Sequence, residues 1–351
     1  ALPICNYQLL AVVNDQAGNQ RTTAFDFVID TSVSVDLITL QNDTGISAVD
    51  NITHAEQPKF RVTTSDDVVS MTATLNGMAC SVTKTADGEW SVTSPVLSTS
   101  GDYTLVVQVT DVAGNASTAS TVITFDNQLS QPVVAFAPGD DTGADAADHL
   151  TGKNRPGFVI SNIDDDVVDM TIMLDGKTVQ VKQDGTGNWV FTPDQPLSDG
   201  SYTMVVNVTD RAGNTHSQDF TFVVDTTVSK PVITLVAQSD TGDSQTDRLT
   251  NDTKPQFSFS NIDPDVYTLQ VVLNGITYDV AKNAQGEWQW TAPELAAGSY
   301  TLTAIVTDKA GNLSTQSLSF VVDTFVRIDG IEMSEDTGYS GSDHLTSDTR
   351  P

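Results

Sequence analysis

A seven-residue motif recurs four times along this chain of 351 residues at nearly constant spacing. It reads Val-Thr-Asp-x-Ala-Gly-Asn in three copies and Val-Asn-Asp-Gln-Ala-Gly-Asn in the first. The copies end at Asn19, Asn115, Asn214 and Asn312. Their aspartates, which lie 96, 99 and 98 residues apart, are Asp15, Asp111, Asp210 and Asp308. A period of this length is the size of a whole domain, so the sequence predicts an array of similar domains. An array repeats the same chemistry in every copy, which favours a structural role over a single catalytic site.

Other landmarks keep the same register. A tyrosine stands eight residues before each motif aspartate, at Tyr7, Tyr103, Tyr202 and Tyr300. An aspartate that closes an apolar strand follows fifteen residues after it, at Asp30, Asp126, Asp225 and Asp323. These landmarks predict complete domains at 32–127, 128–226 and 227–324. Residues 1–31 are expected to be the last two strands of a preceding domain and 325–351 the beginning of a further one, so we expect the chain to be a segment of a longer protein.

Within one copy, the pattern is that of short strands. In the third complete domain, residues 232–236 and 269–273 are short apolar strands, Trp288 and Trp290 alternate with polar neighbours, and residues 300–306 place Leu302, Ala304 and Val306 on one face. Asn274-Gly275 is a strong hairpin signal. Seven such strands separated by turns, with no helical stretch, predict a two-sheet sandwich. The tyrosine that opens the penultimate strand is typical of the tyrosine corner of immunoglobulin-like sandwiches. The predicted fold class is therefore all-β, a tandem array of immunoglobulin-like β-sandwich domains forming an elongated rod.

The composition excludes several classes of partner. The net charge of −30 argues against binding to nucleic acid or to an anionic membrane. No run of 18 apolar residues occurs, so no membrane insertion is expected. The two cysteines, Cys5 and Cys80, fall in different domains, which leaves no disulfide framework to stabilise the array.

The acidic residues point to metal at the junctions between domains. Of the 46 acidic residues, 40 are aspartate, and many sit at fixed register in loops. In an antiparallel sandwich the loops gather at two poles, so the aspartate that ends one domain approaches the loop carboxylates of the next. The predicted groups are Asp30 with Asp67 and Asp111; Asp126 with Asp164, Asp166 and Asp210; and Asp225 with Asp263, Asp265 and Asp308. Carboxylates without histidine or cysteine in register form a hard-oxygen set that selects calcium.

A second candidate metal site is the loop that begins with Asp-Thr-Gly. Each triplet aspartate is followed seven residues later by another, and the two could ligate a cation together with a backbone carbonyl. The pairs are Asp43 and Asp50, Asp141 and Asp148, Asp240 and Asp247, and Asp336 and Asp343. The alternative is that Asp-Thr-Gly is a turn whose carboxylate accepts backbone N–H groups.

The motifs together resemble a known family. The succession Val-Asp-Thr-Thr-Val-Ser-x-Pro-Val-Ile-Thr-Leu, Asp-Thr-Gly, Gly-x-Trp, Gly-Ser-Tyr-Thr and Val-Thr-Asp-x-Ala-Gly-Asn resembles the bacterial immunoglobulin-like repeats of giant non-fimbrial adhesins. The resemblance implies a surface-exposed rod that is exported by type I secretion, stiffened by calcium at its junctions, and able to contact host-cell surface glycans through its terminal units. It extends the calcium role to Asp323. The first complete domain departs from the pattern, because Thr64–Asp67 is one residue shorter than Asn162–Asp166.

The sequence lacks the features of the enzymes whose motifs it partly shares. Asp-Thr-Gly is also a signature of aspartic proteases, but those enzymes need the triplet at the end of an apolar strand, and here small or polar residues precede it. Nothing breaks the repeat to build the cleft of a paired-carboxylate glycosidase. The sequence therefore predicts no catalysis.

Two functional hypotheses remain. In the first, the chain is a repeat segment of a secreted or cell-surface adhesin, a calcium-stiffened stalk whose partners are its own neighbouring repeats. In the second, the repeats themselves form an adhesive surface that binds a carbohydrate or a protein. Aromatic residues found only in the third complete domain, Tyr267, Tyr278 and Trp290, are the candidates for such a surface.

Overall fold

The structure is a computed structural model that describes residues 5–337, 339–342, 344–347 and 349–350. The prediction of an all-β chain is confirmed, because 28 strands and no helix occur in this described part. Accordingly, none of these residues belongs to a helix with the length and apolar composition needed to span a membrane. The chain divides into two compact units. The first holds the chain up to Ala137, Pro156–Asp194 and Ser201–Phe222; the second holds Pro138–Arg155, Gln195–Gly200 and the chain from Val223 onward.

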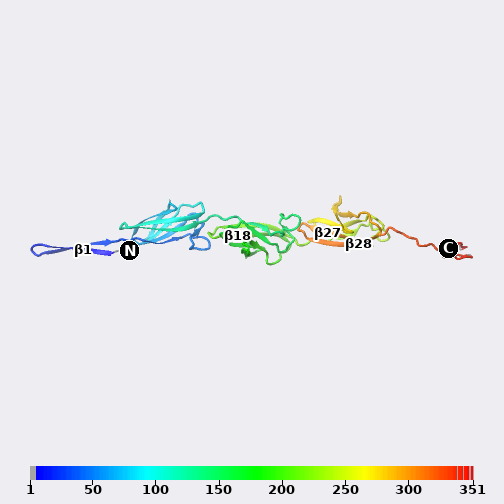
Figure 1. The fold of residues 1–351 in the computed structure, drawn as a ribbon, viewed down its shortest axis with the longest axis horizontal. Helices are drawn as coiled ribbons and strands as arrows, with labels where there is room; N and C mark the ends of the chain where they lie inside the picture. The colour runs from blue at the N-terminus through cyan, green and yellow to red at the C-terminus, as the bar shows by residue number, and fades with distance from the viewer. Residues whose placement is uncertain (1–4, 338, 343, 348, 351) are drawn as a thin grey trace. The chain divides into compact units, whose positions relative to one another are not determined.

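The chain begins with an isolated hairpin. Strand β1 (Cys5–Asn14) pairs with β2 (Gln20–Ile29) in an antiparallel, two-stranded sheet, drawn in dark blue in Figure 1. The first copy of the recurring motif forms the turn, in which Asp15 accepts the backbone N–H and the side-chain amide of Asn19. Almost all side chains of both strands are exposed.

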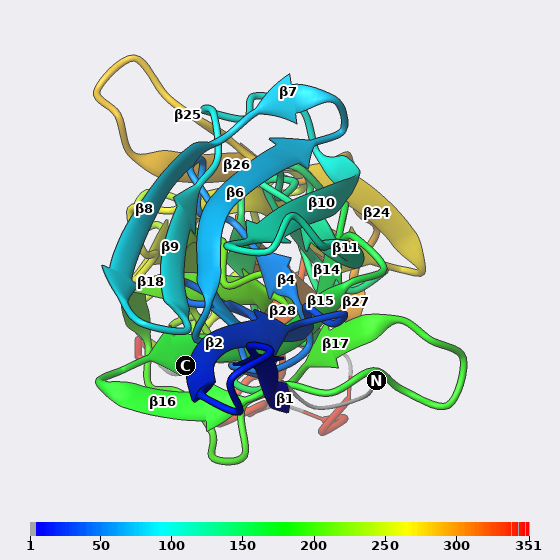
Figure 2. The ribbon, with the colours of Figure 1, turned by 90° about the vertical axis from the view of Figure 1, so that its left-hand side faces the viewer.

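The first complete domain is a sandwich of two sheets, with strand orders β3-β5-β9-β8 and β4-β11-β10-β6-β7. Its strands are β3 (Val35–Leu40), β4 (Ile52–Thr53), β5 (Lys59–Thr64), β6 (Val68–Leu75), β7 (Met78–Ala79), β8 (Ser81–Ala86), β9 (Glu89–Thr93), β10 (Gly101–Asp111) and β11 (Ala116–Phe125). Figure 2 shows β8 beside β9 in one sheet and β6 beside β10 in the other.

The second and third domains repeat this arrangement. The second has strand orders β12-β14-β17 and β13-β19-β18-β15-β16, and the third has β20-β22-β26-β25 and β21-β28-β27-β23-β24. The strands of the second are β12 (Val133–Phe136), β13 (Leu150–Thr151), β14 (Phe158–Ser161), β15 (Val167–Leu174), β16 (Lys177–Gln180), β17 (Trp189–Phe191), β18 (Gly200–Asp210) and β19 (Thr215–Val224). The strands of the third are β20 (Val232–Leu235), β21 (Leu249–Thr250), β22 (Gln256–Ser260), β23 (Val266–Leu273), β24 (Ile276–Asp279), β25 (Ala281–Lys282), β26 (Trp288–Thr291), β27 (Gly298–Asp308) and β28 (Leu313–Val322).

Each core lies between the two sheets of its own domain. In the third domain Phe257 stacks on Trp290 and meets Phe320 edge-on, with ring centroids 6.2 and 5.0 Å apart. Phe257 and Phe320 are almost fully buried. The predicted tyrosine corner is present, because the Tyr300 hydroxyl donates to the carbonyl of Ala296, four residues upstream. The alternating pattern of β27 therefore has the expected cause, one face packed in the core and one in water.

The expected count of seven strands per domain is wrong. Within residues 32–324, all of which the structure describes, the first and third domains have nine strands and the second has eight. One addition in each domain is a two-residue strand inside the long polar loop: β4, β13 or β21. It pairs in parallel with the last strand of its own domain. No alternation marks this segment in the sequence, because its pairing is tertiary.

Candidate metal centre

Three clusters of three aspartates occur among the described residues. In each cluster, one carboxylate oxygen per residue lies within 4.8 Å of the others. The triads are Asp30, Asp67 and Asp111; Asp126, Asp166 and Asp210; and Asp225, Asp265 and Asp308. The first two triads lie within the first compact unit, and the third lies within the second.

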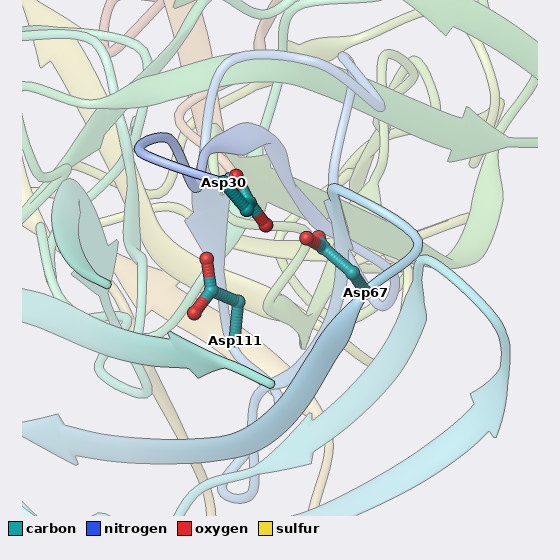
Figure 3. A group of neighbouring side chains, drawn as sticks. All are labelled: Asp30, Asp67 and Asp111. Carbon is teal, nitrogen blue, oxygen red and sulfur yellow. The ribbon is translucent and has the colours of Figure 1, made fainter. Parts of the chain in front are cut away.

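Each triad joins the end of one domain to the beginning of the next. In Figure 3 the carboxylates of Asp30, Asp67 and Asp111 point toward one another. Asp30 follows β2, Asp67 immediately precedes β6, and Asp111 ends β10. In the next triad Asp126 follows β11 of the first domain. Its partners belong to the second domain, where Asp166 immediately precedes β15 and Asp210 ends β18.

Local hydrogen bonds hold the aspartate that follows each last strand. The two-residue strand of the polar loop continues the ladder by one bond, so that the N–H of Asp126 donates to Thr53 O and that of Asp225 to Thr151 O, both at 2.9 Å. The carboxylate of Asp126 also accepts the Ser100 hydroxyl at 3.0 Å. The backbone is therefore fixed at the point where the chain leaves the domain.

The hairpin formed by the recurring motif fixes the aspartate that the motif contributes to each triad. Asp308 is 1% exposed, and its two carboxylate oxygens accept the backbone N–H and the side-chain amide of Asn312, each at 2.8 Å. The same bonds hold Asp111 and Asp210, through Asn115 and Asn214. Although burial acts to raise it, these bonds keep the pKa of Asp111 below its ordinary value.

The remaining member of each triad precedes a strand whose pairing is irregular. The register between β6 and β10 shifts between Thr110 and Asp111 in the first domain, and that between β23 and β27 shifts between Val266 and Thr268 in the third. Such irregularities redirect side chains beside functional sites.

The electrostatics of the triads are unfavourable without a cation. Burial, and then the neighbouring carboxylate of Asp265 and that of Asp308, raise the pKa of Asp225 to about 6. Burial and the adjoining triad members likewise raise the pKa of Asp67 and of Asp166. Two carboxylates 4 Å apart repel by about 4 kcal/mol at an effective dielectric near 20. A bound divalent cation would reverse the sign of that interaction.

The donor set fits calcium. Every member is a carboxylate, no histidine or cysteine joins the clusters, and each group is half-buried or buried. Calcium takes six to eight oxygen ligands in flexible geometry, so three carboxylates supply a substantial part of its shell. Zinc and copper sites instead draw on nitrogen or sulfur.

Three predicted junction residues lie outside the triads. The carboxylate of Asp164 accepts the backbone N–H of Ser130 at 2.6 Å, and that of Asp263 accepts the N–H of Ser229 at 2.6 Å. Asp323 follows β28, and its carboxylate accepts the N–H of Phe325; no triad forms around it in the described part of the chain.

The shorter loop of the first domain explains what this outer position does. Ser65 occupies it, and its hydroxyl oxygen accepts the N–H of Ser34 at 2.9 Å, the bond that Asp164 and Asp263 make in the other domains. Although the loop is one residue shorter, Asp67 still reaches its triad. The position is therefore a turn cap, for which serine and aspartate are equivalent.

The Asp-Thr-Gly loops show a different feature. One oxygen of the triplet aspartate accepts the backbone N–H eight residues on, from Asn51 to Asp43 and from Arg248 to Asp240. The other oxygen is buried and has no hydrogen-bond partner in any of the four loops: Asp43, Asp141, Asp240 and Asp336. Burial, followed by the charge of the aspartate seven residues on, raises the pKa of Asp43 and of Asp141.

The partner aspartates of these loops also have a local role. Asp50, Asp148 and Asp247 each accept the backbone N–H two residues on. Asp343 lies outside the described residues. A buried carboxylate oxygen without a partner is costly, and a cation bound by both aspartates would satisfy it. The turn alternative accounts for only one of the two oxygens.

The asparagine that ends each motif was missed by sequence reasoning. Besides bonding its own hairpin aspartate, the Asn312 amide donates to the carbonyl of Asp225 in the preceding domain at 2.7 Å. Asn214 donates in the same way to Asp126, and Asn115 to Asp30. The presence of this asparagine in all four copies of the motif was the sequence signal that could have indicated such a role.

The aromatic residues proposed for an adhesive surface divide between core and surface. Trp290 and Tyr278 pack against each other, with ring centroids 5.3 Å apart, and against the core. Tyr267 is 59% exposed. These residues therefore do not form one exposed aromatic platform.

Lowering the pH should relieve the repulsion between the carboxylates of the metal-free triads and so stabilise the folded chain. Because the pKa of Asp225 is raised from 3.8 to about 6, the folded state binds a proton more readily than the unfolded state. Proton binding by Asp225 therefore stabilises the folded state. This contribution is fully present below pH 3.8 and is lost as the pH rises through 6. In chelator, the Asp225 carboxylate is expected to add about 1 kcal/mol to the stability of the chain between pH 7 and 5, measured by urea unfolding. An Asp225→Asn variant should gain about that much less than the unsubstituted chain, because its other carboxylates with a raised pKa still titrate. Equal gains in both proteins would contradict the expectation.

Comparison with known proteins gives the family. The model described as "Bacterial Ig-like domain" matches residues 32–127, 128–226 and 227–324. A PII-type proteinase of Lacticaseibacillus paracasei is 28% identical over 282 residues, which cover 73% of this chain but only 14% of the proteinase. A solved calcium-stabilised adhesin that helps an Antarctic bacterium reach out and bind ice is 21% identical, with 91% of this chain and 82% of that chain covered and a TM-score of 0.35. A tetra-tandem repeat from the extending region of a large adhesion protein is 20% identical, with coverages of 92% and 82% and a TM-score of 0.36.

The family match spans most of the sequence, and the five-stranded sheet has the same strand order in all three matched segments. The chain belongs to the bacterial Ig-like domain family, as three tandem immunoglobulin-like β-sandwich domains.

Proposed function

We propose that this chain is a stalk segment of a giant secreted adhesin, in which calcium bound at the domain junctions stiffens an elongated rod. One observation carries the proposal: each triad combines the aspartate that ends one domain with two aspartates of the next. A cation held by all three carboxylates therefore ties consecutive domains together. The role is mechanical and requires no catalysis. Cell-surface location, type I secretion and contact of terminal units with host glycans extend the proposal, on the strength of the motif resemblance alone.

The Asp-Thr-Gly loops are proposed as a second class of calcium site. Their support is the buried, unpartnered oxygen that recurs in all four triplet aspartates. A calorimetric titration separates the two classes, because the triads alone account for three ions per chain and the loops would add to that count.

Removing calcium is expected to destabilise the chain and make it flexible. A site filled at about a hundred times its dissociation constant contributes about 2.7 kcal/mol. For a domain of ~100 residues this corresponds to a fall in Tm of about 10–20 °C. Scanning calorimetry with calcium and with chelator tests the stability, and small-angle scattering tests the rod.

The control is a variant that carries Asp67→Asn, Asp166→Asn and Asp265→Asn, one substitution in each triad. It should respond much less to chelator than the unsubstituted chain does. The proposal fails if the unsubstituted chain keeps the same Tm and the same scattering profile after chelation.

A further inference from the structure

In the first and second domains, the threonine and glycine of the Asp-Thr-Gly loop contact the following domain. The Thr44 hydroxyl donates to the carbonyl of Ala212 at 2.7 Å, and the Thr142 hydroxyl donates to the carbonyl of Ala310. Each alanine belongs to the Asp-x-Ala-Gly-Asn hairpin of the next domain. The first contact lies within the first compact unit and the second within the other.

The backbones at these contacts are too close to admit a side chain. A Cβ at Gly45 would lie 2.1 Å from Arg211 O, and a Cβ at Gly143 would lie 1.9 Å from Lys309 O. The approach is mutual, because a Cβ at Gly213 would lie 2.8 Å from Gly45 N. Atoms cannot come this near without displacing the backbone.

The same motifs elsewhere in the chain serve as an internal comparison. Gly242 has φ +100, close to the +92 of Gly143, but an added Cβ there would meet no heavy atom within 4 Å. The hydroxyl of its neighbour Thr241 instead bonds within the loop, to Asn251 Oδ1 at 3.0 Å. Gly114, in the hairpin of the first domain, is also clear. The close approach thus accompanies the pairing of a loop with a hairpin, and the loop conformation alone does not cause it.

We propose that the Thr-Gly step is a docking surface for the Ala-Gly step of the next domain's hairpin, and that it forms a second attachment independent of the carboxylate triads. None of its contacts involves a carboxylate: they are a hydroxyl, backbone carbonyls and glycine backbone. The inference therefore goes beyond the proposed calcium role. Its partner is a further domain of the same kind, recognised by shape and by the threonine hydrogen bond. In the first contact His54 Nδ1 also bonds the carbonyl of Ala212, at 2.8 Å.

The two attachments act on one five-residue hairpin. In Asp210–Asn214, the first and last residues hold the end of β11 through the triad and through Asn214, while Ala212 and Gly213 contact the loop at Thr44 and Gly45. If the triad were the only attachment, one domain could rotate relative to the other about it. The contact at Thr44 and Gly45 lies at a different point of the preceding domain and restricts that rotation.

Gly143→Ala and Gly242→Ala form a matched pair for testing this surface. Both substitutions place alanine at a positive φ and incur similar backbone strain, but only the first drives a methyl group into the neighbouring hairpin. In saturating calcium, Gly143→Ala should lower the Tm by about 4–8 °C more than Gly242→Ala. Spin labels at Thr178 and Ser319, with Cys5 and Cys80 replaced by serine, should show a broader distance distribution by double electron–electron resonance for Gly143→Ala only.

A milder pair keeps the test decisive if Gly143→Ala does not fold. Thr142→Val should broaden the distance distribution, whereas Thr241→Val should not. All four variants keep the carboxylates of the triads, so calorimetric titration should still count at least the three triad ions per chain, and a failure of docking is distinguishable from a failure of the calcium proposal at the triads. Equal Tm values and equal distance distributions within both pairs would overturn the docking surface.

Discussion

Replacing Asp265 by asparagine is expected to change stability in opposite directions with and without calcium. Burial and then the Asp265 carboxylate contribute to the raised pKa of Asp225, so at pH 7 the metal-free triad holds charges that repel. Removing one of them should stabilise the metal-free chain by about 1–3 kcal/mol. In calcium, the same change removes a ligand and should cost about 2.7 kcal/mol if the site is filled at a hundred times its dissociation constant. Urea unfolding at pH 7, in calcium and in chelator, measures both.

The neighbouring Asp263 provides the control. Its carboxylate caps Ser229 and lies outside the triad. Asp263→Asn should therefore lose about 1 kcal/mol or less, and by the same amount in both buffers. If Asp265→Asn also loses equal stability in both buffers, the triad is not a cation site.

The membership of the triads was largely predictable from sequence, because it depends on topology. Antiparallel strands deliver their loops to two poles, and the strict register of Asp126, Asp166 and Asp210 identifies which loops meet. The all-β fold follows from the short apolar strands and the turn signals between them. These features rest on local pattern and chain direction, which the sequence carries directly.

Orientation within a loop was not predictable in the same way. Asp164 and Asp166 are two residues apart and chemically identical, and only the turn geometry sends one to Ser130 and the other to the triad. The shorter loop of the first domain held the clue, since Ser65 replaces the outer aspartate while Asp67 stays.

Long-range backbone contacts were the other omission. The bond from Asn312 to the carbonyl of Asp225 joins residues 87 apart. The two-residue strand β21 forms because β28 offers an unpaired edge, although nothing in Leu249–Thr250 marks it as a strand. Such contacts depend on how finished elements pack. The recurrence of the asparagine marks it as important, but the pattern of residue types does not name its partner.

Replacing Asp308 by alanine should be among the most damaging single changes at a junction. The substitution removes one triad ligand and both acceptors of Asn312, and it does so at a side chain that is 1% exposed. Unsatisfied buried donors cost about 1–3 kcal/mol, and loss of a filled cation site adds about 2.7, so we expect a loss of about 4–6 kcal/mol in calcium. Urea unfolding should show this loss, and calorimetric titration should show one calcium ion fewer per chain.

Asp15 is the matched control for this change, because it makes the same two bonds to Asn19, also at 2.8 Å, on the exposed β1–β2 hairpin and outside any triad. Asp15→Ala removes the hairpin bonds alone. It should leave the calcium count and the unfolding of the third domain unchanged. If Asp308→Ala retains the full calcium count, the hairpin aspartate only anchors its own turn, and the remaining two carboxylates would have to account for binding at that junction.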